Sequence, residues 1–164
     1  MIKDEPNLLE RVVGLLTENG IPYCVIGGQA VSAFVEPVIS LDLDFVVPKE
    51  EFERVESLMV NAFNIRRYRP WLSVSMGGSD FRVQFLTDPE LEKFIARATS
   101  RQVLGMILPV ASLADVFHSK VWAAQDPARR ASKRQKDLAD IARLLEVYPH
   151  FREELPEDIR ARLY

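Results

Sequence analysis

The 164-residue chain contains very little cysteine and histidine, with one cysteine and two histidines. The single cysteine, Cys24, cannot form an internal disulfide, so we expect a reducing, cytoplasmic setting. Neither His118 nor His150 has a histidine or cysteine partner at ligand spacing, which argues against a zinc site. No apolar run approaches the roughly 20 residues that a membrane-spanning helix needs, and no secretory signal pattern is present. We therefore expect no membrane contact.

The chain also lacks an excess of basic charge, because 21 Lys and Arg stand against 24 Asp and Glu, for a formal net charge of −3. Without a global basic field, any nucleic-acid contact has to be local. One basic cluster begins the long C-terminal helix: Arg129, Arg130, Lys133, Arg134 and Lys136. Cations at a helix N-terminus are mildly unfavourable. We therefore interpret the cluster either as a solvated helix end or as a surface for an RNA or protein acceptor.

Hydrophobic residues make up 48% of the chain, enough for the core of one domain. Helical periodicity predicts helices over 6–19, 29–34, 50–62, 89–98, 112–125 and 132–147, with a last short helix after Pro156. Alternation and turn signals predict strands over 22–26, 40–47, 65–68, 72–76 and 81–86, and a hairpin over 102–109. The pattern indicates an α+β fold, with a small mixed β-sheet flanked by helices over 1–110. A helical segment, 111–164, is expected to pack on it as part of a single structural unit.

Two aspartates one residue apart are the most informative pattern in the sequence. Asp42 and Asp44 lie in an apolar run that predicts a strand, where residues i and i+2 project from the same face. Two neighbouring carboxylates repel each other unless a cation lies between them, and Mg²⁺ favours such oxygen ligands together with substrate phosphates. Gly27 and Gly28 end the preceding apolar run. The pattern predicts a metal-dependent protein that handles nucleotides.

Each part of this pattern also has a structural explanation. Paired glycines can serve a tight turn alone, because glycine adopts positive φ without steric cost. An Asp-x-Asp strand can lie on a solvated face of a sheet. Their combination, in this order, favours the functional interpretation.

The segment from Gly27-Gly28 to Asp42-Leu43-Asp44-Phe45 resembles the signature of the DNA polymerase beta superfamily of nucleotidyltransferases. That signature is a hydrophobic residue, two small residues, a spacer, and then two acidic residues that alternate with hydrophobic ones. Residues 111–120 and 136–141 are similar to the helical tail of the minimal bacterial members, which include the AbiEii-like toxin group. The resemblance covers about residues 20 to 147.

The resemblance implies a role for each matching residue. Gly27 and Gly28 would let the backbone approach a nucleoside triphosphate, and Asp42 and Asp44 would be catalytic residues that hold Mg²⁺. Lys120 would contact the outgoing phosphates, unless it is a solvated lysine. The reaction implied is transfer of a nucleoside monophosphate from the triphosphate to an unidentified acceptor.

The chain departs from the superfamily at one position. A third carboxylate usually stands on a later strand beside the first two, and here the aligned residue is Gln84. An amide has no charge and cannot accept the proton of an acceptor hydroxyl. The alternatives are therefore an active transferase, a catalytically inactive relative that binds a nucleotide or a protein partner, and a plain interaction domain. The basic residue that often precedes the aspartates is also missing, since Val38 stands there.

Three further expectations concern charged residues. Asp137 and Asp140 lie three apart on the long helix, and we expect a basic neighbour such as Lys136 or Lys120 to pair with one of them. Asp88 is expected to cap the helix that follows it. The arginines of the 66–69 segment, interleaved with aromatic residues, either continue the basic surface or belong to an exposed strand and loop.

Overall fold

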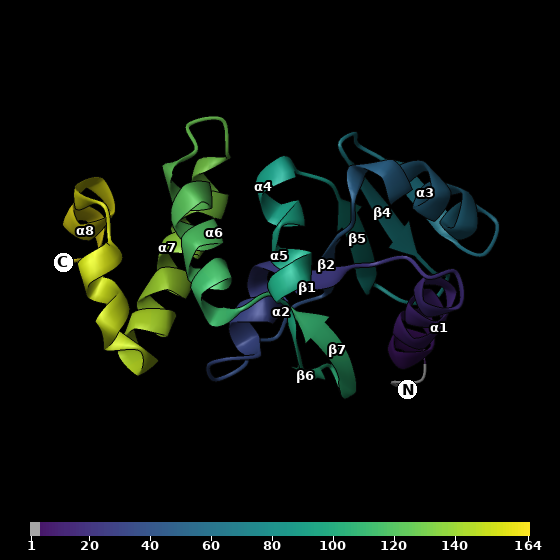
Figure 1. The fold of residues 1–164 in the computed structure, drawn as a ribbon, viewed down its shortest axis with the longest axis horizontal. Helices are drawn as coiled ribbons and strands as arrows, with labels where there is room; N and C mark the ends of the chain where they lie inside the picture. Colours follow the sequence, from purple (N-terminus) through teal and green to yellow (C-terminus); the bar gives the residue numbers. More distant parts are fainter. Residues whose placement is uncertain (1–3) are drawn as a thin grey trace.

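In a computed structural model that describes residues 4–164, one seven-stranded mixed sheet forms the centre of the molecule (Figure 1). The strands are β1 (Cys24–Ile26), β2 (Asp42–Val46), β3 (Asn64–Arg67), β4 (Trp71–Ser75), β5 (Arg82–Leu86), β6 (Thr99–Val103) and β7 (Met106–Val110). Their spatial order is β3-β4-β5-β2-β1-β7-β6. β2 runs parallel to β5, and β1 runs parallel to β7, while the remaining neighbours are antiparallel. The predicted mixed sheet is confirmed.

The helices are α1 (Asp4–Glu18), α2 (Gly27–Ser32), α3 (Phe52–Val60), α4 (Pro89–Glu92), α5 (Phe94–Arg97), α6 (Leu113–Gln125), α7 (Ala131–Val147) and α8 (Glu157–Leu163). Two 3₁₀ segments, η1 (Lys49–Glu51) and η2 (Pro149–Glu154), complete the set, and the sequence did not predict the second. The helix predicted over 89–98 is two short helices, α4 and α5. Within residues 4–164 no helix combines the length and the apolar character that crossing a bilayer requires.

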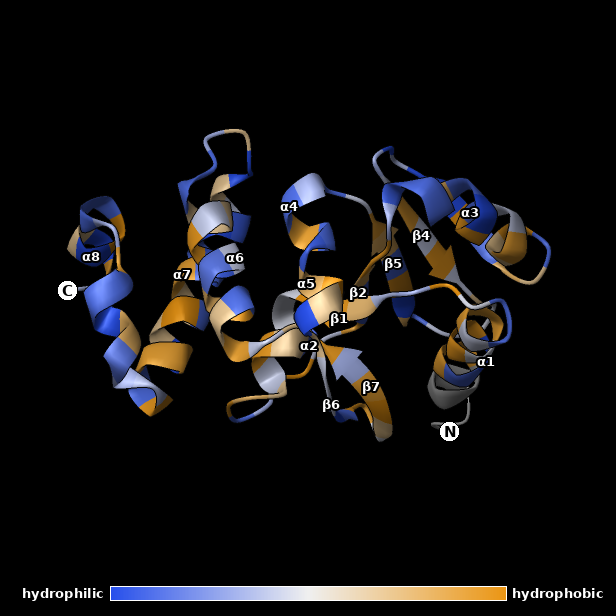
Figure 2. Cartoon of the chain, viewed as in Figure 1, coloured by the Kyte–Doolittle hydropathy of each residue, from blue (hydrophilic) through white to orange (hydrophobic). Residues whose placement is uncertain are grey.

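One face of the sheet forms the main core. Leu43, Phe45, Val83 and Phe85 alternate along β2 and β5 and are fully buried on this face. Figure 2 shows the resulting apolar stretches along the strands. Helix α3 lies on the same side, since its Glu56 pairs with Arg67 of β3, and α1 packs beside α3. Two-residue alternation thus separates this apolar face from a polar one.

The other face carries polar side chains and the C-terminal helices. Helix α2 contacts β1 and β2, and it also contacts α6, which packs along α7 and α8. The hydroxyl of Ser112 caps α6 by accepting the Asp115 N–H at 3.2 Å. The Asp115 carboxylate does not reach back to complete a capping box. Instead it accepts two hydrogen bonds from the Arg97 guanidinium, at 2.8 and 3.0 Å, and so ties α5 to α6.

Candidate active site

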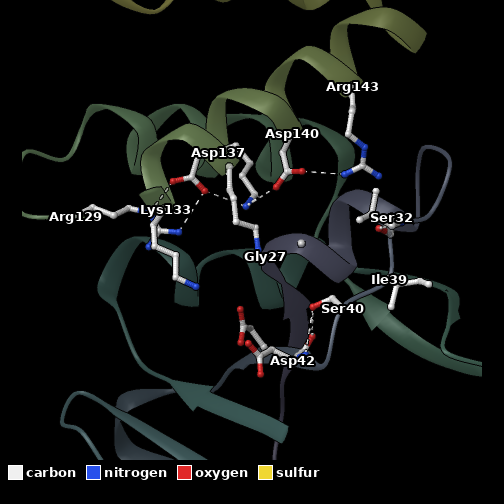
Figure 3. A pocket seen from close by; sticks show the side chains of 15 residues that line it. Gly27, Ser32, Ile39, Ser40, Asp42, Arg129, Lys133, Asp137, Asp140 and Arg143 are labelled. Carbon is white, nitrogen blue, oxygen red and sulfur yellow. Dashed lines mark hydrogen bonds and ion pairs between the residues drawn. The ribbon is translucent and has the colours of Figure 1, made fainter. Parts of the chain in front are cut away.

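A cleft of about 160 Å³ lies between the start of α2, the strand β2 and the helices α6 and α7 (Figure 3). Five residues named by the sequence pattern line it together: Gly27, Gly28, Asp42, Asp44 and Lys120. Ten others complete the lining: Ser32, Val38, Ile39, Ser40, Arg129, Lys133, Lys136, Asp137, Asp140 and Arg143. One wall is therefore acidic and belongs to the sheet, while the opposite wall is rich in cations and belongs to the helices.

The acidic wall consists of Asp42 and Asp44, which share one side of β2 as the alternation predicts. Asp42 Oδ1 accepts a hydrogen bond from Arg82 Nε at 3.1 Å. Asp44 Oδ1 is buried and has no hydrogen-bond partner among the residues that the structure describes. A buried carboxylate oxygen without a donor is costly. Because a hard cation would satisfy this oxygen, the pair fits Mg²⁺.

The residues around Asp44 also perturb its protonation. Burial, and in second place the neighbouring negative charge of Asp42, raise the Asp44 pKa from 3.8 to about 6. Lys120, Lys133 and Arg129 act in the opposite direction, because positive charges favour the carboxylate. The cations of the opposite wall therefore offset only part of the effect of burial and of Asp42, and the Asp44 pKa stays raised.

This shift predicts how stability depends on pH in the absence of divalent cations. A carboxyl group whose pKa is raised on folding destabilises the folded state once it ionises, so the free energy of unfolding falls as pH rises from about 4 to 7. Asp44→Asn removes this loss. At pH 7 the variant is expected to be more stable than the parent by up to about 3 kcal/mol. Urea unfolding of both proteins from pH 4 to 8 measures the difference, which should vanish near pH 4; a difference independent of pH contradicts the assignment.

Gly27 brings the backbone directly against Asp44. Its φ is +74°, and a Cβ at this position would stand 2.7 Å from Asp44 Oδ2. Gly28 is helical, and an added Cβ there would meet no described atom within 4 Å beyond its chain neighbours and the backbone of its own helix. Glycine is therefore required at the first position for two separate reasons, backbone conformation and space, and at the second position for neither.

The two glycines provide a matched pair of substitutions. Gly27→Ala is expected to destabilise the protein by about 1–3 kcal/mol, since it strains the backbone and displaces the Asp44 carboxylate. Gly28→Ala is expected to leave stability unchanged or to raise it by up to about 1 kcal/mol, as alanine favours the helix. Denaturant unfolding midpoints measure both values. Equal effects at the two positions would contradict the close approach of Gly27 to Asp44.

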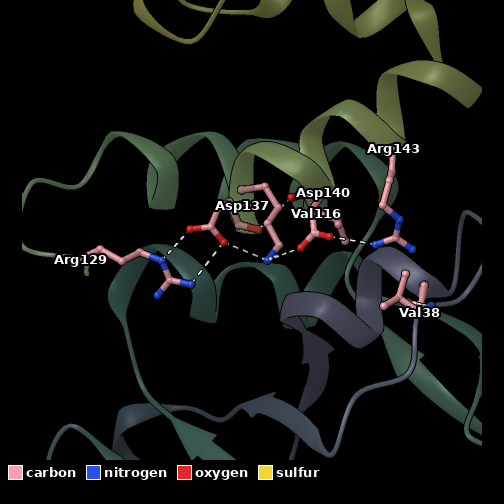
Figure 4. A network of polar contacts seen from close by, with 9 residues as sticks. Val38, Val116, Arg129, Asp137, Asp140 and Arg143 are labelled. Carbon is pink, nitrogen blue, oxygen red and sulfur yellow. Dashed lines mark hydrogen bonds and ion pairs between the residues drawn. The ribbon is translucent and has the colours of Figure 1, made fainter. Parts of the chain in front are cut away.

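The basic wall comes from α6, α7 and the loop between them. Lys120 Nζ lies 3.1 Å from Asp137 Oδ1 and 3.0 Å from Asp140 Oδ2 (Figure 4). Arg129 binds the same Asp137 at 2.6 Å, and Arg143 binds Asp140 at 2.8 Å. The predicted pairing of Asp137 and Asp140 with a basic neighbour is confirmed, and Lys120 pairs with both.

This network sets which cations remain available in the cleft. Lys120 is only 8% exposed, and its ammonium is shared between two carboxylates. Lys133 and Lys136 line the cleft without an ion pair to any residue in the range 4–164. The positive charge in the cleft lining that no carboxylate within residues 4–164 pairs with therefore belongs to these two lysines, of which Lys133 acts on Asp44.

Gln84 occupies the place expected for the missing third carboxylate. It is directly opposite Asp44 in the parallel register of β2 and β5. Asp88 accepts hydrogen bonds from the Glu90 and Leu91 N–H groups, so it caps α4 as predicted. Within residues 4–164 no group of three or more His, Cys, Asp or Glu side chains comes together as a metal site. Any metal here would rely on two carboxylates, with other ligands from substrate and water.

Some residues of the site were not identified from the sequence. Arg82 was missed, although the parallel register of β2 and β5 places it opposite Asp42. Arg143 was also missed, although it lies three residues after Asp140, at the spacing of a helical ion pair. Arg130 and Arg134, predicted with Arg129 and Lys133 as one surface, are not among the residues that line the cleft.

Comparison with known proteins agrees with this architecture. Residues 21–164 match the family described as Nucleotidyl transferase AbiEii toxin, Type IV TA system. No curated protein sequence matches the chain significantly.

Solved structures share the fold at low sequence identity. The antibiotic-resistance factor ANT(2'')-Ia is similar with a TM-score of 0.63 and 16% identity, over 95% of this chain and 91% of that one. An antigenic nucleotidyltransferase-like protein from Paracoccidioides brasiliensis gives a TM-score of 0.60 and 14% identity, over 89% and 77%. The lincosamide antibiotic adenylyltransferase LnuA gives 0.54 and 10%, over 83% and 95%.

Proposed function

Since the chain belongs to the AbiEii nucleotidyl transferase toxin family and has a nucleotidyltransferase fold, we propose that it transfers a nucleoside monophosphate from a nucleoside triphosphate to an acceptor hydroxyl. The observation that carries this proposal is the opposition of two walls in one cleft. Asp42 and Asp44 face a set of lysines and arginines across the Gly27 bend. A triphosphate with its divalent cation has the complementary charge for both walls.

The basic wall is the proposed binding site for the triphosphate tail. Lys133 and Lys136 supply positive charge that no carboxylate in the described part of the chain neutralises. Lys120 contributes at shorter range, while Asp137 and Asp140 hold it in place. Gly27, at the start of α2, has no side chain, and the Asp44 carboxylate occupies the space that a Cβ would fill, so the α2 backbone lies directly against the acidic pair. We therefore assign Arg129 and Lys133 to the triphosphate. The contact with RNA or protein that the sequence predicted for the whole cluster remains a proposal for Arg130 and Arg134 only.

The acidic wall is the proposed binding site for Mg²⁺. Asp42 and Asp44 would hold the ion, which would neutralise charge developing on the phosphate and orient the acceptor hydroxyl. In the reaction the acceptor oxygen bonds to the α-phosphorus, and the bond from that phosphorus to the bridging oxygen breaks. Pyrophosphate leaves with the bonding electron pair, and the hydroxyl proton passes to water, because Gln84 has no basic oxygen to take it.

Gln84 also supports a second candidate function, a relative that binds nucleotides without catalysis. Its amide stands where the superfamily resemblance places a third acid, directly beside Asp44. In that case the cleft would bind a triphosphate and no transfer would follow. Gln84→Asp tests this alternative, since turnover that appears only in the variant would identify the wild-type protein as an inactive relative.

The deciding experiment measures pyrophosphate release. The protein is incubated with Mg²⁺, each of ATP, CTP, GTP and UTP in turn, and mixed RNA or small-molecule acceptors. Release that needs both Mg²⁺ and a triphosphate supports the transferase. A triphosphate that raises the melting temperature without any release supports the binding relative, since a ligand at a hundredfold excess over its Kd adds about 2.7 kcal/mol of stability. If the protein shows no pyrophosphate release and no shift in melting temperature, both candidate functions are contradicted.

A further inference from the structure

A second hollow lies on the same polar face of the sheet, beside the cleft. It has a volume of about 480 Å³ and opens over β3, β4 and β5. Its floor and rim include Arg66, Trp71, Ser73, Arg82 and Gln84. We refer to it as the strand groove. The strand groove and the cleft share no lining residue, and the Arg82–Asp42 ion pair joins them at their border.

The register of the strands places the strand groove in line with the acidic pair. Asp44 is opposite Gln84, Gln84 is opposite Ser73, and Ser73 is opposite Arg66. Four polar side chains therefore form one row across β2, β5, β4 and β3. At about 4.8 Å between neighbouring strands, the row extends about 14 Å from Asp44 to the edge of the sheet. A molecule lying along this row would have one end at the acidic pair.

The side chains of the strand groove favour an anionic ligand with a flat ring. The Arg82 side chain is half exposed, and Arg66 is exposed with no ion pair among the described residues. Asp80 is the one acidic side chain in the lining. Tyr68 and Trp71 stack with ring centroids 4.2 Å apart, which presents aromatic surface at the rim. Arginine beside exposed aromatic rings is the combination that binds the phosphates and bases of single-stranded nucleic acid.

We propose that the strand groove is the acceptor subsite and that the acceptor is a nucleotide unit, with its phosphate on Arg66 and Arg82 and its base against the Tyr68–Trp71 pair. This inference rests on the proposed transferase function, which supplies the reason for an acceptor to end at Asp44. A nucleotide unit can come from the end of a single-stranded RNA or from a free nucleotide. A polycationic acceptor does not fit, because the strand groove carries two arginines against one aspartate.

Adjacent arginines on β3 offer a matched control for this proposal. Side chains alternate along the strand, so Arg66 faces the strand groove while Arg67 points to the other face and pairs with Glu56 of α3. Arg66→Gln and Arg67→Gln remove the same charge from the same strand. A general loss of positive charge would affect both variants equally, whereas loss of the acceptor subsite affects only the first.

The experiment is a binding measurement without catalysis. Fluorescence anisotropy follows a labelled eight-nucleotide single-stranded RNA with the wild-type protein and both variants, from 50 to 300 mM salt. Arg66→Gln is expected to weaken binding about fivefold or more and to lower the slope of log K against log salt by about one. Arg67→Gln should stay within twofold of wild type. Unlabelled nucleoside monophosphate and unlabelled RNA are then compared as competitors of the labelled RNA. If the monophosphate competes as strongly as the RNA, the acceptor is a free nucleotide; if it competes more weakly, the acceptor is RNA.

Three results would overturn the proposal. These are equal weakening in both variants, no binding of RNA or nucleoside monophosphate by the wild-type protein, and tighter binding of the polycation spermine at the expense of RNA. The melting-temperature shift with Mg²⁺ and a triphosphate is recorded for the same samples. If that shift persists while RNA binding fails, the strand-groove proposal is wrong and the cleft proposal stands; if the shift is missing, the cleft proposal is the one that fails.

Discussion

Replacing Asp42 with asparagine is expected to lower the rate of pyrophosphate release by a hundredfold to a thousandfold, while the protein stays folded. The substitution removes one of the two charges that would hold the divalent cation, and loss of one such electrostatic contact costs about 3–4 kcal/mol of transition-state stabilisation. Its ion pair with Arg82 is partly exposed and contributes little to stability. A continuous pyrophosphate assay at saturating triphosphate measures the rate.

The control for this prediction is a carboxylate outside the site. Glu90 on α4 is exposed, and among residues 4–164 its one ion-pair partner is Lys93, three residues away. Glu90→Gln is expected to release pyrophosphate at the parental rate, and the unfolding midpoints of both variants should stay within a few degrees of the parent. If Asp42→Asn keeps more than a third of the activity, the acidic wall is not catalytic and the proposed function fails.

Replacing Lys120 with methionine is expected to lower the free energy of unfolding by about 3 kcal/mol, with a fall in melting temperature of roughly 10 °C. Lys120 lies between Asp137 and Asp140, and the Asp137 side chain is only 1% exposed. Without the Lys120 ammonium, Asp137 keeps Arg129 and Asp140 keeps Arg143, but the two neighbouring carboxylates lose the cation that they share. Removing one member of a buried ionic network is costly because the others stay desolvated. Thermal and urea unfolding measure the loss.

Lys136→Met is the matched control for this second prediction. Lys136 lines the same cleft and makes no ion pair within the described range, so its loss should change stability by less than about 0.5 kcal/mol. Both lysines are assigned to the triphosphate, so both variants should need more triphosphate for half-maximal pyrophosphate release. Equal stability of the two variants would show that the network around Lys120 does not support the fold.

The sequence predicts the acidic wall of the cleft because local rules decide it. Leu43 and Phe45 are fully buried, so the two-residue period of β2 leaves Asp42 and Asp44 on the other face. The hairpin of β4 and β5 and the Ser112 cap also follow from short-range chemistry. In these segments turn residues, caps and alternation all favour the same structure.

The basic wall could not be predicted in the same way, because tertiary packing decides it. Lys133 and Arg129 line the same cleft as the acidic pair only because α7 packs along α6 and across α2. Nothing within one helical turn indicates this, so from the sequence alone the basic cluster is either a solvated helix end or an acceptor surface. Asp115 is a second example. It stands three residues after the cap residue Ser112, at the spacing of a capping box, but its carboxylate pairs with Arg97, 18 residues away in the sequence.

The Asp42–Arg82 ion pair separates the two hollows, and this separation bears on the order in which the two reactants can bind. The hollows on its two sides have no residue in common, so neither reactant needs to leave before the other arrives. In the proposed arrangement, with the donor in the cleft and the acceptor in the strand groove, both reactants are held together and react by direct displacement. Under this arrangement the protein has no need to carry the nucleotidyl group itself, and no side chain is required to act as a nucleophile.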